Sequence, residues 1–186
     1  MTLHDGASGN NTVSASGDTA ASAGKSLTYD AGLGADSFTG GFENDTIYAG
    51  TGLGSYTASS GSDSFVFIAD NLATQTLGNF QPSLDDILVY GIHAINGSDL
   101  GSADNALNPT SPTAITASIF TASASGAFTS SSQRFAYDTT NGALQYSATG
   151  SNSSESLVAT LTGVPTITAT TCRSSIRNYD GRTPLI

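Results

Sequence analysis

The stretch AGLGADSFTGGFENDTIYAGTGLGSYTASSGSDSFV, residues 31–66, divides into four blocks of nine residues without an insertion or a deletion. Each block carries Ser or Thr at its seventh position and a large apolar or aromatic side chain at its eighth. The eighth-position residues are Phe38, Ile47, Tyr56 and Phe65. The sixth-position residues are Asp36, Asp45, Gly54 and Asp63. A period this regular predicts a repetitive fold in which short units stack on one another.

The same frame extends towards the N-terminus through two more blocks, VSASGDTAA from Val13 and SAGKSLTYD from Ser22. Six blocks then cover residues 13–66, and the added sixth-position residues are Asp18 and Leu27. We therefore expect the repeats to begin at Val13.

The composition of a block predicts its local structure. Gly at several of the first six positions permits backbone angles that other residues rarely adopt, which favours a tight turn. The last three positions favour a very short strand whose central side chain points inward. Two blocks would then close one coil, and successive coils would stack about 4.8 Å apart through parallel strand pairing.

The blocks closely resemble the motif G-G-x-G-x-D-x-U-x of the repeats-in-toxin family of calcium-binding proteins, most strongly over residues 31–48. The resemblance implies an all-β fold, with a short parallel β-roll of nonapeptide repeats followed by an antiparallel or irregular β cap. The pattern is imperfect, because Glu43 replaces a Gly, and Leu27 and Gly54 replace Asp. Two other interpretations stay open: a Gly- and Asp-rich linker with accidental periodicity, and a β-coil in which degenerate turns hold no ion.

The resemblance also implies calcium ions between the turns of alternate repeats. Stacked carboxylates repel one another unless a cation lies between them, and calcium prefers carboxylate and carbonyl oxygens. The expected side-chain ligands are Asp18 with Asp36, and Asp45 with Asp63, while a weaker position pairs Asp36 with the turn at Gly54. The expected carbonyl ligands lie near Gly32, Gly34, Gly41 and Glu43.

The segment DSFVFIADNLATQTLGNFQPSLDDILVYGI, residues 63–92, resembles the flank that follows these repeats in serralysin-type proteases and related secreted proteins. Its strands are expected to cover the open end of the coil, and Asp85 and Asp86 are candidates for closing a last calcium site. We expect a calcium-binding β-roll over residues 1–66, a β-rich capping region over 67–167, and a disordered tail over 168–186 that contains Cys172. Within the cap, Asn141–Gly142 predicts the turn of a hairpin.

Charge and the N-terminal sequence bear on partners and location. The chain has 15 acidic and 5 basic residues, giving a net charge of −10, which argues against nucleic acid as a partner. The polar N-terminal sequence does not resemble a signal peptide, and no apolar run is long enough to span a bilayer. The resemblance implies a secreted, extracellular protein exported by type I secretion machinery, with an upstream effector domain if the chain is a fragment.

The catalytic inventory is small. Neither an H-E-x-x-H nor a G-x-S-x-G motif is present. His93 with Asp99 nearby in sequence is a weak catalytic candidate, and an exposed loop His is the alternative. We therefore expect a calcium-binding module that folds when calcium binds. Two alternatives are a small calcium-dependent hydrolase of esters or lactones, in which the cation polarises a carbonyl group, and a structural or adhesive surface module.

Overall fold

The computed structural model of the chain describes residues 2–4, 9–17, 25–68, 72–90 and 113–175. Their regular structure is almost entirely β, and the helical segments among them are two short 3-10 turns, η4 (Ala117–Ile119) and η5 (Ala169–Thr171). None of the described residues belongs to a helix long and apolar enough to cross a membrane.

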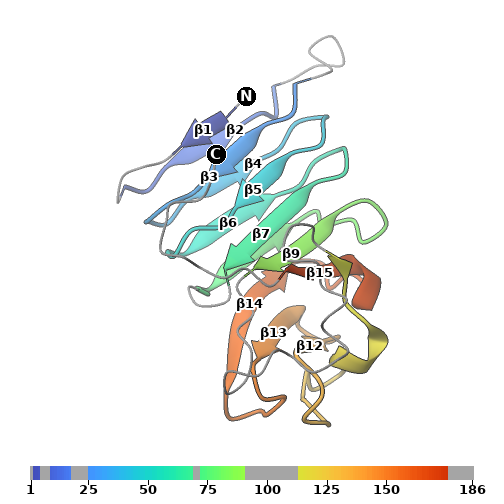
Figure 1. Ribbon diagram of the computed structural model, residues 1–186. Coiled ribbons are helices and arrows are strands. Elements are labelled where there is room, and N and C mark those ends of the chain that lie inside the picture. Colours follow the sequence, from blue (N-terminus) through green and yellow to red (C-terminus); the bar gives the residue numbers. More distant parts are fainter. Residues whose placement is uncertain (1, 5–8, 18–24, 69–71, 91–112, 176–186) are drawn as a thin grey trace.

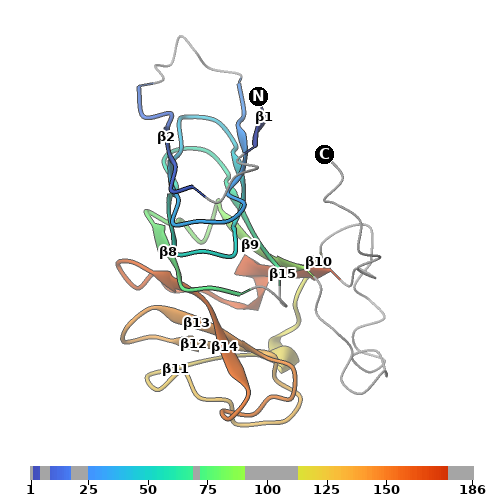
Figure 2. The same ribbon diagram turned by 90° about the vertical axis from the view of Figure 1, so that its left-hand side faces the viewer.

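Strands β1 to β9 alternate between two sheets and form a roll-like stack of parallel strands (Figures 1 and 2). The strands of the first sheet are β1 (Thr2–His4), β3 (Thr28–Asp30), β5 (Thr46–Tyr48), β7 (Ser64–Ile68) and β9 (Asp86–Tyr90). The strands of the second are β2 (Thr12–Ser14), β4 (Ser37–Thr39), β6 (Gly54–Thr57) and β8 (Gln75–Gly78). The parallel all-β architecture expected from the nine-residue period is therefore present, and it continues past Val66 as far as Tyr90.

Every strand of the stack contributes a side chain to the interior, and β7 and β9 each contribute a second one, Phe67 and Val89. Strand register aligns the other side chains in two columns. The first column is Leu3, Tyr29, Ile47, Phe65, Ile87 and Cys172, and the second is Val13, Phe38, Tyr56, Leu77 and Leu161. Tyr29 and Phe38 stack across the interior with ring centroids 5.3 Å apart. Each fully buried side chain of this size contributes about 1.5–3 kcal/mol, so the eighth position of each block holds the stack together.

The N-terminal coil does not follow the expected frame. Strand β4 pairs with Thr12–Ser14, and Val13 lies beside Phe38. The observed pairing therefore differs from the expected frame, in which the block VSASGDTAA begins the repeats at Val13, and Asp18, the expected sixth-position residue of that block, lies outside the described residues. Thr and Val, which are branched at Cβ, fit a pleated strand better than the Ala residues of that block, so the inward position is taken by Val13, and Asn11 precedes the strand where Asp18 was expected.

The remaining strands extend both sheets of the stack. They are β10 (Thr113–Ala114), β11 (Phe120–Ser123), β12 (Phe135–Asp138), β13 (Ala143–Ser147), β14 (Glu155–Leu161) and β15 (Cys172–Ser175). Strand β14 adds to β8 in parallel, and β13 and β12 follow it as an antiparallel hairpin. The hairpin turns at Gly142, whose φ of 79° is readily adopted only by Gly. The C-terminal region thus covers the last coil, as an open sheet edge requires.

The segment 168–175 is ordered, whereas we expected disorder over 168–186. Strand β15 pairs in parallel with β9, and Cys172 lies beside Ile87 with no exposed surface. Arg173 pairs with Asp86, its Nε lying 2.9 Å from Oδ2, although its N–H group is not aligned for a hydrogen bond. Tertiary pairing orders a segment whose composition alone did not favour a strand. Residues 176–186 lie outside the described part of the chain.

Candidate metal-binding edges

The sixth-position residues line the two edges of the stack, each immediately before a strand or at its first residue. One column precedes the strands of the first sheet and consists of Leu27, Asp45, Asp63 and Asp85. The other precedes or begins the strands of the second sheet and consists of Asn11, Asp36, Gly54 and Gln75. We call these the Asp85 edge and the Gln75 edge. Each edge is built by the turns that connect one sheet to the other.

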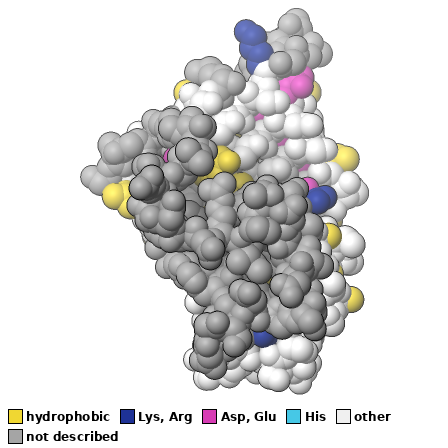
Figure 3. Space-filling model, viewed as in Figure 1, with side chains coloured by type: hydrophobic (Ala, Val, Ile, Leu, Met, Phe, Trp, Pro, Cys, Tyr) yellow, Lys and Arg dark blue, Asp and Glu magenta, His cyan; other side chains and the backbone are white. Residues whose placement is uncertain are grey.

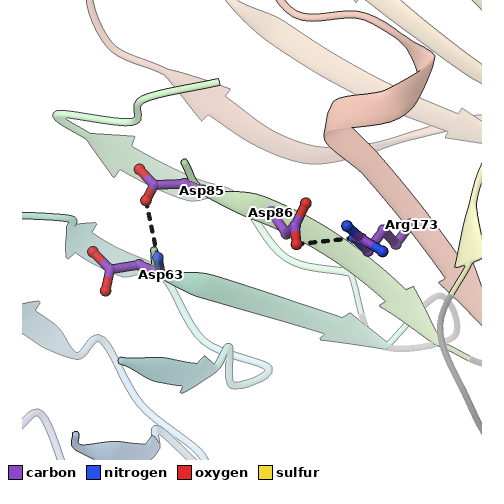
Figure 4. A network of polar contacts seen from close by, with 4 residues as sticks. All are labelled: Asp63, Asp85, Asp86 and Arg173. Carbon is purple, nitrogen blue, oxygen red and sulfur yellow. Dashed lines mark hydrogen bonds and ion pairs between the residues drawn. The ribbon is translucent and has the colours of Figure 1, made fainter. Parts of the chain in front are cut away.

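A ladder of hydrogen bonds joins successive coils along the Asp85 edge. Each carboxylate accepts, through Oδ1, the backbone N–H of the residue one coil earlier. Leu27 donates to Asp45 at 2.9 Å, Asp45 donates to Asp63 at 2.8 Å, and Asp63 donates to Asp85 at 2.9 Å. The last of these bonds is drawn in Figure 4. The ladder fixes each carboxylate between two turns.

The three carboxylates of this edge differ in the hydrogen bonds that their second oxygen, Oδ2, accepts. Asp45 Oδ2 accepts the N–H of Gly41 at 3.2 Å, and Asp85 Oδ2 accepts the N–H of Gln81 at 2.8 Å, in both cases from the same turn. Asp63 Oδ2 is buried and accepts no hydrogen bond of acceptable geometry, although the amide of Ser59 lies near enough to influence the carboxylate. A buried carboxylate oxygen without a partner is costly, and it is the atom on this edge best suited to face a cation.

Burial disfavours the ionised form of two of the carboxyl groups on this edge, those of Asp63 and Asp85. Asp45, Asp63 and Asp85 are each exposed by 2% or less, and acidic side chains show only small areas on the face of the molecule in Figure 3. Burial, followed by the neighbouring charges of Asp85 and Asp45, raises the pKa of Asp63 to about 6, against the opposing effect of its hydrogen bond from Asp45. Burial also raises the pKa of Asp85. The column therefore holds negative charge at a cost at neutral pH.

Backbone carbonyls supply further oxygens on the Asp85 edge. The carbonyl of Gly41 accepts the N–H of Ser60 in the next coil at 3.0 Å. The carbonyl of Glu43 faces Gly61 so closely that a side chain on Gly61 would collide with it. Both carbonyls expected as ligands on this edge thus point towards the turn that carries Asp63, and each carbonyl oxygen retains a second lone pair.

The Gln75 edge begins in the same way. Asp36 Oδ1 accepts the N–H of Asn11 at 2.9 Å, so Asn11 takes the place expected for Asp18. Asp36 Oδ2 is buried without a hydrogen bond, because the amide of Gly32, equivalent to that of Gly41, donates to Asp30 instead. The carbonyls of Gly32 and Gly34 on this edge also face the next turn.

Further along this edge the column ends in Gln75 instead of a carboxylate, and the sequence analysis did not identify this residue. Gln75 is 1% exposed, and its side chain reaches back to the turn one coil earlier. Its Nε2 donates to the carbonyls of Gly50 at 3.0 Å and Gly52 at 2.7 Å. The chain between Val66 and Gln75 breaks the nine-residue period, so only the alternation in Thr76-Leu77 pointed to Gln75 as a sixth-position residue.

The two candidate carboxylates at the end of the stack point in different directions. Asp85 belongs to the ladder, whereas Asp86 points away from it towards Arg173 (Figure 4). Of this pair, only Asp85 is placed to act as a ligand on the edge. Asp18, His93 and Asp99 lie outside the described residues.

The described residues contain no group of three or more His, Cys, Asp or Glu side chains arranged around one point to hold a metal. A cation on either edge would therefore draw on one or two carboxylates and otherwise on turn carbonyls. Oxygen ligands of this kind suit calcium, whereas zinc and copper prefer nitrogen or sulfur.

Comparison with known proteins leaves the family open. No protein-family model, curated protein sequence or solved structure matches this chain.

Proposed function

We propose that this chain is a calcium-binding module of the repeats-in-toxin type, whose roll-like stack of nonapeptide repeats folds when calcium binds along the Asp85 edge. The observation that carries the proposal is the column of buried carboxylates Asp45, Asp63 and Asp85, in which Asp63 keeps one oxygen without a hydrogen bond. Ionised carboxylates in a buried column repel one another and lose hydration. A divalent cation between the turns would offset both costs.

The residues that would hold the cation are those of adjoining turns. Asp45 and Asp63 would supply carboxylate oxygens, and Gly41 and Glu43 would supply carbonyl oxygens. Asp85 would serve the last turn of the same edge. On the other edge the buried Oδ2 of Asp36, with the carbonyls of Gly32 and Gly34, supports a further position.

Binding would be coupled to folding, because the ligands come from turns that are adjacent only in the stacked chain. The unfolded chain has no such site, so calcium would bind the folded state and stabilise it. We expect affinity in the range of extracellular modules, with Kd of about 10⁻⁴ to 10⁻³ M. Secretion through type I machinery, and an upstream effector domain if the chain is a fragment, belong to the same proposal and rest on the resemblance.

The proposal is tested by calcium titration and circular dichroism of the whole chain. We expect a gain of β-sheet signal and of Tm when calcium replaces chelator, and a weaker gain in Asp45→Asn. Asp86→Asn is the matched control, since its carboxylate points to Arg173 rather than along the edge. Spectra and Tm that do not change on adding calcium would refute calcium-driven folding.

A further inference from the structure

On the Gln75 edge, the side chain of Gln75 lies next to backbone carbonyl oxygens of the turn one coil earlier. Its amide nitrogen lies within hydrogen-bond distance of two carbonyl oxygens of the preceding turn, those of Gly50 and Gly52. Two carbonyl oxygens that converge on one point repel each other unless a donor or a cation lies between them. The amide nitrogen meets that need, which also fixes the orientation of the amide group.

The same two positions of the earlier turns have no such side chain. Gly50 and Gly52 correspond in the repeat to Gly32 and Gly34 on this edge, and to Gly41 and Glu43 on the Asp85 edge. In those turns the residue one coil later at the sixth position is Gly54, which has no side chain, or Asp63, whose ionised carboxylate accepts the N–H of Asp45 and has no proton to donate to the carbonyls. Gln75 is long enough to reach them and carries no charge.

We propose that the Gln75 amide takes the place of a cation at this turn, so that the Gly50–Gly54 turn is a latent cation site closed by an internal donor. The inference rests on the proposed function in one respect, since the cation that it replaces is the one expected at the other turns. It assigns to Gln75 the role of deciding that this turn binds no calcium.

Gly54, the sixth-position residue one coil before Gln75, supports the same interpretation. A side chain on Gly54 would collide with Gln75 Oε1 and with the hydroxyl of Tyr56, so the conformation of Gln75 requires Gly at position 54. Gly54 is the only sixth-position residue between Ala31 and Val66 without a carboxylate. Because Gly54 has no carboxylate, Gln75 and Tyr56 fill the space beside it. The carbonyls of Gly50 and Gly52 then receive a hydrogen bond from the Gln75 amide.

Gln75→Glu tests the proposal, because it replaces the donor with an oxygen beside the two carbonyls. Three oxygens would then converge, and the turn would require a cation. We expect Gln75→Glu to bind one more calcium ion per chain than the natural protein in equilibrium dialysis. We also expect its Tm to fall in chelator and to recover by about 5–11 °C at calcium 100-fold above Kd. If the variant does not fold in chelator, the readout becomes calcium-induced recovery of its circular dichroism.

Two further variants serve as controls. Gln145→Glu makes the same charge change on β13, beyond the stack, and should bind no additional calcium. Gln75→Met keeps the length of the side chain but cannot donate, so we expect it to lower Tm equally with and without calcium. A Gln75→Met variant as stable as the natural protein would mean that the carbonyls need no donor, which would overturn the proposal.

Terbium locates the new site. The chain has no Trp, so sensitised terbium emission must come from Tyr, and the Tyr56 hydroxyl accepts the N–H of Gly50 at 3.3 Å. The emission gained in Gln75→Glu should disappear when Tyr56→Phe is added. An unchanged calcium count in Gln75→Glu would overturn this inference alone if the natural protein binds calcium. A natural protein that binds none, with a variant that binds one ion, would refute the proposed function and leave the inference standing.

Discussion

Asp63→Asn should change the stability of the protein in opposite directions with and without calcium. Asn is nearly isosteric with Asp, and its carbonyl oxygen can still accept the N–H of Asp45 that Asp63 Oδ1 accepts at 2.8 Å. The substitution therefore removes the buried charge of Asp63 while preserving the ladder. What it does to stability depends on whether that charge has a cation beside it.

The pKa of Asp63 gives the magnitude in chelator. Raising this pKa from 3.8 to about 6 makes the ionised form roughly 3 kcal/mol less favourable in the fold than in the unfolded chain. Solvent screening close to the turn surface reduces this value, and we use about 1–2 kcal/mol. At pH 7.5 in chelator, Asp63→Asn should thus be about 1–2 kcal/mol more stable than the natural protein.

Saturating calcium should reverse the order. Calcium at 100-fold above Kd stabilises the natural protein by about 2.7 kcal/mol for one site. A variant that has lost the site gains none of this, so it should be about 1 kcal/mol less stable than the natural protein. Urea denaturation followed by circular dichroism measures both differences. Asp86→Asn, which removes the adjacent charge from outside the ladder, should show no reversal.

The pH dependence provides a second measurement on the same pair of proteins. The pKa of Asp63 is higher in the fold than in the unfolded chain, so the stability that its proton supports is complete below about pH 3.8. That stability is lost as the pH rises through about 6. In chelator the natural protein should lose stability across this window, and Asp63→Asn should lose less. Equal destabilisation by Asp63→Asn with and without calcium, together with an unchanged pH profile, would refute the assigned role of Asp63.

Gly52→Ala should destabilise the protein by about 3 kcal/mol or more, because the new Cβ would overlap the backbone carbonyl of Gly34. Gly17→Ala, which meets no atom within 4 Å, is its control in thermal melts, and equal Tm values would contradict the stacking of these turns. Burial, followed by the charge of Asp86, raises the pKa of the Cys172 thiol to about 12, so the native protein should resist alkylation at neutral pH and react only after unfolding. Rapid alkylation of the native protein, measured by mass spectrometry, would show that β15 is not paired with β9 and does not bury Cys172.

Much of the stack could be predicted from residues 31–66 because the relevant preferences are local. Gly-rich turns and three-residue strands form from neighbours in sequence, and the period places Phe38, Ile47 and Phe65 inward. The same period places Asp45 and Asp63 in successive coils, as the offset of 18 residues in their hydrogen bond confirms. For these residues, spacing along the chain translates directly into position in the fold.

Outside this stretch the coils vary in length, and only tertiary pairing decided which residues align. The coil that ends at Asp36 spans an offset of 25 residues and brings in Asn11 rather than Asp18, and the coil that ends at Asp85 spans 22. Strand pairing likewise places Gln75 on its edge, through β8 and β6, and Cys172 in the interior, through β15 and β9. An insertion in a turn shifts the count of residues but leaves inward packing and strand pairing intact. The sequence by itself therefore determined the repeating unit and its edge of aspartates, whereas the tertiary structure decided where the columns begin, how they end and which residue closes the second edge.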